Sequence, residues 1–220
     1  MYTITINKCH CRVLSKALDI YKSTLRGELK RIPLLYGENK NTYISLGLVD
    51  ESVFDDFIKK IRNDFFTIES EHFQRYINII QLNKHGINLT NVKKRLIDTC
   101  LIFSNNKLDN IDFKLTAEEL VIIQIACELY WNIQIANINH IISLELLSKN
   151  TNDKFKADIN DMADVIKSFA SDLGSDIMSP AINRKAKWCY DIANTIDCFL
   201  KGKEHRLVGT LNRLIIKKYG

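Results

Sequence analysis

Proline and glycine are scarce in this sequence, and long apolar runs are missing. Only two prolines and eight glycines occur among 220 residues, which argues against a loop-rich β-sandwich and favours helices. No apolar run reaches the ~18 residues that would suggest a membrane span, and the N-terminus lacks the pattern of a signal peptide. We therefore expect a cytoplasmic protein without a membrane partner, in which the six cysteines are thiols.

The common catalytic and metal-binding motifs are also missing. The sequence contains no P-loop, dinucleotide-binding glycine motif or nucleophile elbow, so nothing marks a phosphate loop or a catalytic triad. Cys9-His10-Cys11 has no second ligand pair of the kind that zinc sites need, and we interpret it as part of a half-buried helix. We expect no catalytic residue, no bound metal and no cofactor.

The net charge of +5 is concentrated at the C-terminus. The segment 201–220 holds six basic side chains and one acidic side chain, so the first 200 residues are formally neutral. A general nucleic-acid binder carries its basic groups over one broad face. The tail therefore supports nucleic-acid binding only as an alternative hypothesis.

The sequence contains a stretch that resembles a later stretch of the same chain. Residues Ile4–Ile32 and Phe113–Ile141 align at an offset of 109 positions, which pairs Ile4 with Phe113 and Tyr21 with Tyr130. Matched segments in the same order indicate a tandem duplication. We predict a first helical lobe at 1–105, a second at 111–200 and a basic amphipathic helix at 201–220.

Local patterns predict mainly helices with two short strands. Alternating residues at Tyr2–Ile6, and a similar run at Asp112–Leu115, favour strands that pair in a minor sheet. Asn7 is expected to cap a helix that ends at Pro33, and Thr116-Ala-Glu-Glu119 is a capping box.

Further boundaries follow from turn residues and possible caps. The turn-rich segment 36–50 contains a β-like run at 42–49, and Thr90 and Pro180 are expected to begin helices, whereas Gly174 is expected to end one. The fold class is therefore all-α with minor strands. The repeat suggests two lobes related by a pseudo-two-fold axis, so that one chain imitates a homodimer.

Two sets of polar residues are candidates for a site. Tyrosines, arginines and one aspartate near the repeat's first helix and the late AKWCYD segment are expected to form a ligand pocket, in which the arginines hold an anion: Tyr21, Arg26, Tyr130, Arg184, Tyr190 and Asp191. Packed tyrosines at a helix junction are the competing interpretation.

Three aspartates offer a different chemistry. Asp158, Asp161 and Asp164 recur every third residue, and such carboxylates suit Mg²⁺. All-α nucleotide pyrophosphohydrolases use carboxylates on two facing helices, whereas the matching segment here offers only Asp55 and Asp56. We therefore interpret the three aspartates as a solvated acidic edge and assign no metal ligand.

The motifs ALDIY…LRGELKRI and AKWCYDIANTI resemble a group of small uncharacterised proteins of phages and prophages of low-GC Gram-positive bacteria. That group has an ALDLY-type first helix, an arginine-glycine step and a late AYDI-type helix. In this chain the arginine-glycine step occurs only in the first copy, and the AYDI-like element is clear only in the second. The resemblance implies a phage accessory protein of the host cell cytoplasm.

The resulting hypothesis is a non-enzymatic viral protein that counters host antiviral defence by binding. Its partner is either a defence protein or a small nucleotide signal, and it acts as a monomer or a homodimer. One alternative is a metal-dependent nucleotide hydrolase of the all-α type. A second alternative is a nucleic-acid-binding protein that uses the basic tail. An inhibitor of a protein should carry an exposed apolar or acidic patch.

Overall fold

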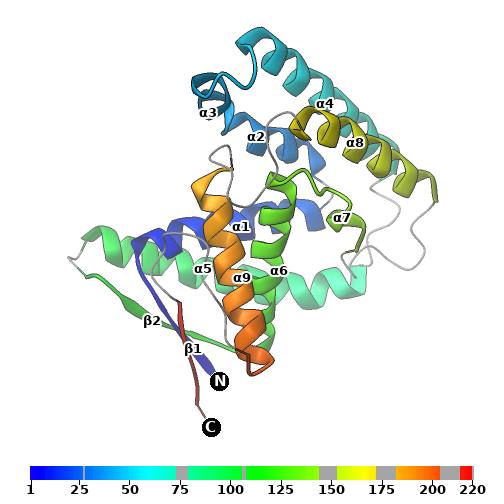
Figure 1. Cartoon of the computed structure of the whole chain (residues 1–220). Helices are drawn as coiled ribbons and strands as arrows, with labels where there is room; N and C mark the ends of the chain where they lie inside the picture. The colour runs from blue at the N-terminus through cyan, green and yellow to red at the C-terminus, as the bar shows by residue number, and fades with distance from the viewer. Residues whose placement is uncertain are drawn as a thin grey trace. The chain divides into compact units, whose positions relative to one another are not determined.

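Helices dominate the structure, and a small antiparallel sheet accompanies them (Figure 1). The computed structural model describes residues 1–26, 28–72, 79–105, 108–143, 153–171, 182–203 and 214–219. The mainly helical fold class with minor strands is confirmed. No helix in the described part of the chain is long and apolar enough to cross a membrane.

The chain divides into two compact units, each assembled from separate segments. Unit 1 comprises 1–22, 83–130 and 184–220, and unit 2 comprises 23–82 and 131–183. These units do not follow the boundaries of the two predicted lobes, because each unit takes segments from both halves of the sequence.

Unit 1 contains the sheet and the helices that follow its first two strands. The strands are β1 (Tyr2–Ile6), β2 (Ile111–Leu115) and β3 (Ile215–Lys218), in the order β2-β1-β3. Four helices also lie wholly or mostly in this unit: α1 (Lys8–Leu25), α5 (Ile79–Asn105), α6 (Ala117–Gln134) and α9 (Arg184–Leu200).

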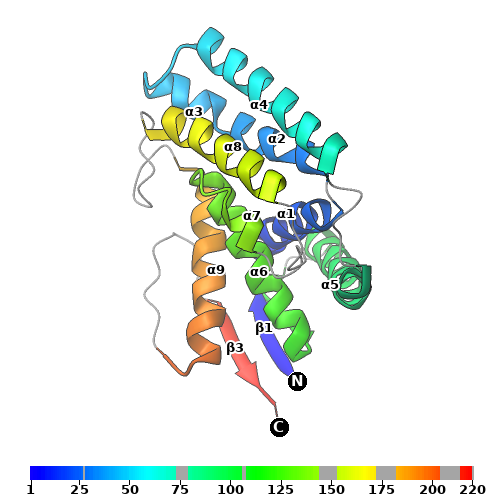
Figure 2. The ribbon, with the colours of Figure 1, turned by 90° about the vertical axis from the view of Figure 1, so that its right-hand side faces the viewer.

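The sheet confirms both predicted strands and their pairing. β1 pairs antiparallel with β2, and Ile4 lies opposite Phe113. Both side chains are buried, as the alternating pattern requires when one face of a sheet packs on the core. On its other edge β1 pairs antiparallel with β3, with Ile4 opposite Ile216 (Figure 2).

Equivalent elements of the two copies have matching bounds. β1 and β2 each span five residues, α1 and α6 each span 18, and both pairs of elements keep the offset of 109. Ile4 and Phe113, which the repeat aligns, are also partners in the ladder. An antiparallel pair of strands with this register has a local two-fold axis at such a position, and the duplication itself stays a prediction.

The N-terminal caps of these two helices are also equivalent. The amide of His10 donates to Asn7 Oδ1 at 2.9 Å, and the amide of Asn7 donates to His10 Nδ1 at 3.1 Å. In the second copy the amide of Glu119 donates to Thr116 Oγ1 at 3.2 Å, and the amide of Thr116 donates to Glu119 Oε2 at 2.9 Å. Both predicted caps are therefore present as reciprocal capping boxes.

Matching hydrogen bonds also close the C-terminal ends of the two helices. The amide of Glu28 donates to the Ser23 carbonyl at 2.9 Å, and the amide of Asn137 donates to the Asn132 carbonyl at 2.8 Å. Such a bond over five residues is typical of the Schellman motif, whose preceding residue is left-handed. That residue in the second copy is Ala136, with φ of 63°.

The connection that follows α1 differs from the prediction. α1 ends at Leu25 instead of continuing to Pro33, which lies in the first turn of α2 (Ile32–Gly37) after a short 3₁₀ helix at Leu29–Arg31. Proline suits a first turn because its missing amide has no helical partner there. The β-like run at 42–49 was also a wrong prediction, because α3 occupies Lys40–Ser45.

Two further boundaries were predicted incorrectly. Thr90 begins no helix, because α5 runs through it. The predicted C-terminal helix is wrong at Ile215–Lys218, where β3 pairs with β1. The predicted boundaries at Gly174 and Pro180 lie outside the described residues, as do residues 204–213.

Unit 2 contains two long helices that lie side by side in both views (Figures 1 and 2). These are α4 (Glu51–His72) and α8 (Asp153–Ser171), and the short helix α7 (His140–Ser143) also belongs to this unit. The rings of Phe57 and Phe169 stack with centroids 3.7 Å apart. Because Phe57 lies early in α4 and Phe169 lies late in α8, the two helices are antiparallel.

Candidate functional site

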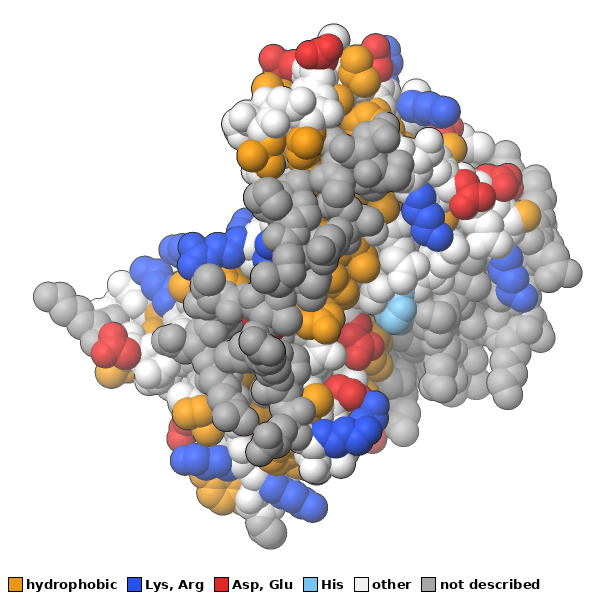
Figure 3. Space-filling view, viewed as in Figure 1, with side chains coloured by type: hydrophobic (Ala, Val, Ile, Leu, Met, Phe, Trp, Pro, Cys, Tyr) orange, Lys and Arg blue, Asp and Glu red, His pale blue; other side chains and the backbone are white. Residues whose placement is uncertain are grey.

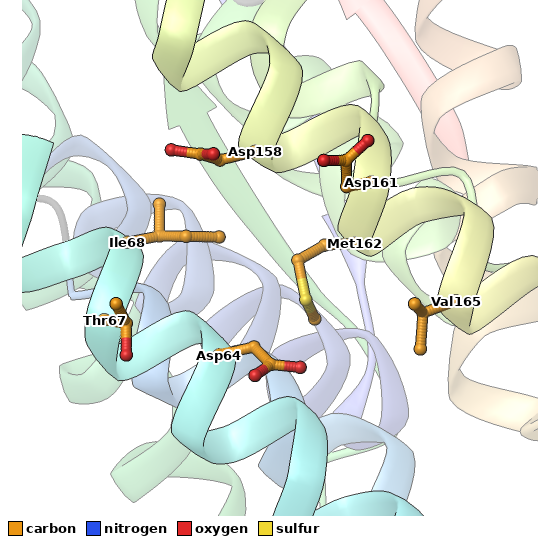
Figure 4. A pocket seen from close by; sticks show the side chains of 7 residues that line it. All are labelled: Asp64, Thr67, Ile68, Asp158, Asp161, Met162 and Val165. Atoms are coloured by element: carbon orange, nitrogen blue, oxygen red, sulfur yellow. The ribbon is translucent and has the colours of Figure 1, made fainter.

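A groove lies between α4 and α8 toward the other end of the pair, and we call it the acidic groove. Its volume is about 350 Å³, and its lining includes the carboxylates of Asp64, Asp158 and Asp161 (Figure 4). Asp64 comes from α4, and the other two come from α8. The groove lies entirely within unit 2.

The rest of the lining is mainly apolar. Ile68 and Met162 point from the two helices toward the space between them (Figure 4), and Val165 extends the apolar surface along α8. Ile68 is 6% exposed and Met162 is 4% exposed, so they form a floor rather than a rim. Thr67 completes the lining, and its hydroxyl donates to the Asn63 carbonyl at 3.1 Å.

Helical spacing explains why these side chains share one groove. On α8 the lining residues stand at positions i, i+3, i+4 and i+7, beginning at Asp158, and on α4 they stand at i, i+3 and i+4, beginning at Asp64. Residues three and four apart lie on one face of a helix. Packing of the two helices brings these two faces together, with the carboxylates beside the buried apolar groups.

Sequence reasoning found part of this arrangement. The sequence indicates that Asp158 and Asp161 lie close together on one helix, but the matching segment of the first copy points to Asp55 and Asp56 instead of Asp64. Asp55 is instead paired with Lys40 Nζ at 2.8 Å. Asp164 is exposed and does not line the groove.

The three carboxylates surround the groove without converging. Figure 4 shows them pointing in different directions, and no group of three Asp, Glu, His or Cys side chains in the described residues is placed to hold a metal ion. A divalent ion requires several oxygens at about 2.0–2.6 Å from one point. The groove therefore presents a broad negative surface.

The residues predicted to bind a ligand lie in different environments. Tyr21, Tyr130 and Asp191 belong to unit 1 and are 0%, 1% and 2% exposed. The hydroxyls of Tyr21 and Tyr130 have no hydrogen-bond partner among the described residues, and burial raises the pKa of both. The three side chains therefore belong to the core of unit 1.

The remaining predicted residues are more accessible. Arg184 is exposed, and its guanidinium lies 4.9 Å from the centre of the Trp188 ring on the same helix, a cation–π contact. Tyr190 is half-buried in unit 1, and Arg26 is exposed in unit 2. An anion pocket that includes these residues stays a prediction.

The Cys-His-Cys segment lies at the start of α1. Cys9 is exposed, His10 forms the capping box, and Cys11 is buried. Burial, together with a hydrogen bond to Cys100, raises the pKa of the Cys11 thiol. These three side chains therefore have separate environments, in agreement with the interpretation as helix residues.

The described Lys and Arg side chains that Figure 3 shows lie in small groups, with acidic and apolar side chains between them. In the tail, Lys217 and Lys218 are exposed on β3. The described part of the tail is therefore an edge strand with two basic side chains.

Comparison of the chain with protein family models, curated proteins and solved structures finds no match.

Proposed function

We propose that this chain is a phage-encoded binding protein without enzymatic activity, which counters host antiviral defence by holding a defence protein. The phage origin and the role against defence rest on the resemblance of the ALDIY and AKWCYD motifs. The preference for a protein partner rests on the acidic groove. An acidic or apolar surface patch is what an inhibitor of a protein was expected to carry.

The acidic groove has the size and composition of a recognition site. Ligand sites have volumes of roughly 300–1,000 Å³ and combine an apolar lining with a few polar groups. The groove's volume of about 350 Å³ lies near the lower end of that range. It therefore suits one side chain of a partner better than a whole nucleotide.

Its charge also favours a cationic partner over a nucleotide signal. Phosphate groups are repelled by carboxylates, and the groove's lining contains three Asp side chains and no Lys or Arg in the described part of the chain. The arginines proposed to hold an anion, Arg26 and Arg184, are not among the lining residues. The nucleotide-binding form of the hypothesis has no comparable support.

One observation favours the hydrolase alternative. All-α nucleotide pyrophosphohydrolases use carboxylates on two facing helices, and the lining of the groove includes Asp64 from α4 and Asp158 and Asp161 from α8. A titration with Mg²⁺ that follows the stability of the protein, combined with an assay for nucleotide cleavage, tests this alternative. Cleavage that depends on Mg²⁺ and is lost in Asp64→Asn would establish the hydrolase.

A phage-protection assay tests the main proposal. The gene is expressed in hosts that carry single defence systems, and phage plating is compared with and without it. We expect plating to recover in one host, and the affected defence protein to co-purify with the wild-type chain. Absence of recovery against every system tested, or release of an intact nucleotide from the denatured protein, would contradict the protein-inhibitor proposal.

The nucleic-acid alternative needs point substitutions rather than a deletion. Removing residues 201–220 would also remove β3, which pairs with β1, and would leave a buried strand without its partner. Lys217→Ser combined with Lys218→Ser removes two exposed charges and keeps the backbone ladder. Nucleic-acid binding that disappears in this variant would support the alternative.

A further inference from the structure

We infer that the free edge of β2 pairs with the same edge of a second copy of this chain, so that two three-stranded sheets join into one. In Figure 1 β2 is an outer strand, because β1 lies between β2 and β3. The sheet belongs to unit 1, whereas the acidic groove belongs to unit 2. Pairing at this edge is therefore independent of what the groove binds.

The hydrogen bonds between β1 and β3 determine which backbone groups of β2 face the free edge. The amide of Tyr219 donates to the Met1 carbonyl at 3.0 Å, and the amino group of Met1 donates to the Tyr219 carbonyl at 3.4 Å. Successive residues of a strand direct their N–H and C=O groups to opposite sides, so odd-numbered residues of β1 bond to β3 and even-numbered ones to β2. Each even-numbered residue of β1 lies opposite an odd-numbered residue of β2. Asp112 and Lys114 therefore direct their backbone groups toward the free edge.

A contact of Arg95 agrees with this assignment. Arg95 Nη1, which belongs to α5, donates to the Lys114 carbonyl at 2.7 Å. A carbonyl oxygen has two lone pairs, so it can accept a second hydrogen bond from a partner strand. No other strand in the described part of the chain pairs with this edge, and an edge with unpaired backbone groups is a template for a further strand.

The side chains of β2 are complementary to those of a second copy. Asp112 and Lys114 are both exposed, and they lie on the same face of the strand because they are two residues apart. When two β2 strands pair antiparallel about Phe113, Asp112 of each copy lies opposite Lys114 of the other. Opposite charges in such positions stabilise an antiparallel pair. A shift by two residues would instead oppose two aspartates or two lysines, so the charges select this register and its two-fold axis.

The other edge of the sheet lacks this complementarity. β3 carries the exposed Lys217 and Lys218 and no acidic residue, so two copies of it would bring only positive charges together. Lysines on an edge strand are a common protection against pairing. The contrast between the two edges favours β2 as the edge that accepts a second copy.

The size of the edge predicts a weak dimer. β2 spans five residues, so the contact between the two strands is small. Ile102 adds apolar surface beside it, because it is 42% exposed and stands seven positions after Arg95, on the same side of α5. Small interfaces are typical of transient association. We therefore expect the dimer to form at high micromolar concentrations and to dissociate on dilution.

Sedimentation of the full chain over a range of concentrations tests the pairing by charge reversal. Asp112→Lys and Lys114→Asp each place like charges opposite one another at both cross-strand positions, and each should weaken self-association about tenfold. The double variant Asp112→Lys/Lys114→Asp restores opposite charges, as does an equal mixture of the two single variants. Both should associate about as strongly as the wild type. Lys217→Asp is the matched control, because Lys217 lies in the same cross-strand row as Lys114 but on the other outer strand, and it should leave association unchanged.

Amide hydrogen exchange followed by NMR gives a measurement that needs no variant. The amides of Asp112 and Lys114 should exchange more slowly as the concentration of the wild type rises, because the partner strand supplies their acceptors. The amides of Ile216 and Lys218, which face the outer edge of β3 by the same alternation, should be unaffected. Circular dichroism checks that each variant is folded, and for any variant that is not, the exchange measurement decides.

Several outcomes would overturn the inference. They are a wild type that stays monomeric at every concentration, single variants that associate as well as the wild type, a double variant and a mixture that both fail to associate, and a loss in Lys217→Asp equal to that in Lys114→Asp. Slower exchange at the edge of β3 instead of β2 would also overturn it. Protection of a host by a chain that stays monomeric would refute the pairing and leave the proposed function in place.

Discussion

Replacing Tyr21 with phenylalanine removes a buried hydroxyl that has no hydrogen-bond partner among the described residues. Tyr21 is 0% exposed. A buried polar group without a partner costs about 1–3 kcal/mol in desolvation, and phenylalanine keeps the ring that packs in unit 1. The small void left by the hydroxyl reduces the gain. We therefore expect Tyr21→Phe to raise the free energy of unfolding by about 1 kcal/mol.

Tyr36 provides a matched control with the opposite expectation. Its hydroxyl is also buried, but it donates to the Ile133 carbonyl at 2.6 Å within unit 2. A typical hydrogen bond contributes about 0.5–1.5 kcal/mol to stability. The Ile133 carbonyl also accepts the amide of Ala136 at 3.0 Å, so the substitution does not leave it without a donor. We expect Tyr36→Phe to lower the free energy of unfolding by about 1 kcal/mol.

Urea unfolding followed by circular dichroism measures both variants beside the wild type. A difference of about 2 kcal/mol between them corresponds to about 4–8 °C in melting temperature for a chain of this size. The free energy of unfolding must rise in Tyr21→Phe and fall in Tyr36→Phe. If both variants changed it in the same direction, the loss of a tyrosine hydroxyl as such would explain the result. A loss of stability of more than about 0.5 kcal/mol in Tyr21→Phe would refute the reasoning, since it would mean that the hydroxyl is hydrogen-bonded.

Three further predictions concern stability and are checked by the same unfolding measurement. Thr116→Ala removes one half of the capping box of α6 and should cost about 1 kcal/mol, whereas Thr116→Ser should cost much less. Asn39→Ala should cost about 1–3 kcal/mol, because it leaves the buried Gln134 Oε1 without the donor that lies 2.8 Å away; an unchanged stability would contradict this. Burial, reinforced by Lys185, lowers the pKa of Lys16 from 10.5 to about 8, so the unfolded chain binds more protons between these two values and stability should rise with pH there. Lys16→Met should therefore stabilise the protein at pH 7, and the gain should shrink from pH 8 to pH 10.5; a gain independent of pH would show that charge is not its cause.

The parts of the fold that the sequence predicted correctly are those decided by neighbouring residues. Alternation was sufficient for β1, residue types three apart were sufficient for the capping box at Thr116 and Glu119, and the residue type alone was sufficient for the cap at Asn7. The tail was predicted incorrectly because Leu207, Leu211 and Leu214 have a helical spacing, whereas β3 forms by pairing with the distant β1. The segment 36–50 contains turn-favouring residues, yet the buried Tyr36 and Tyr43 hold short helices there.

The candidate site shows the same division between local and distant information. The spacing of Asp158 and Asp161 is visible in the sequence, because both lie on one helix. Asp64 lies nearly a hundred positions earlier, and only the antiparallel packing of α4 on α8 brings it to the groove. The repeat directed attention to equivalent positions of the two copies, whereas antiparallel helices bring the end of one beside the beginning of the other.

The pairing of Ile4 with Phe113 has a consequence for how the two halves of the chain depend on each other. A fragment that ends within 104–110 would contain β1 without β2, and its complement would contain β2 without β1, so each would expose a strand edge that normally pairs. Two such fragments should complement each other when they are co-expressed. Joining them by a short flexible link replaces association between molecules with association inside one molecule, at an effective concentration on the order of millimolar.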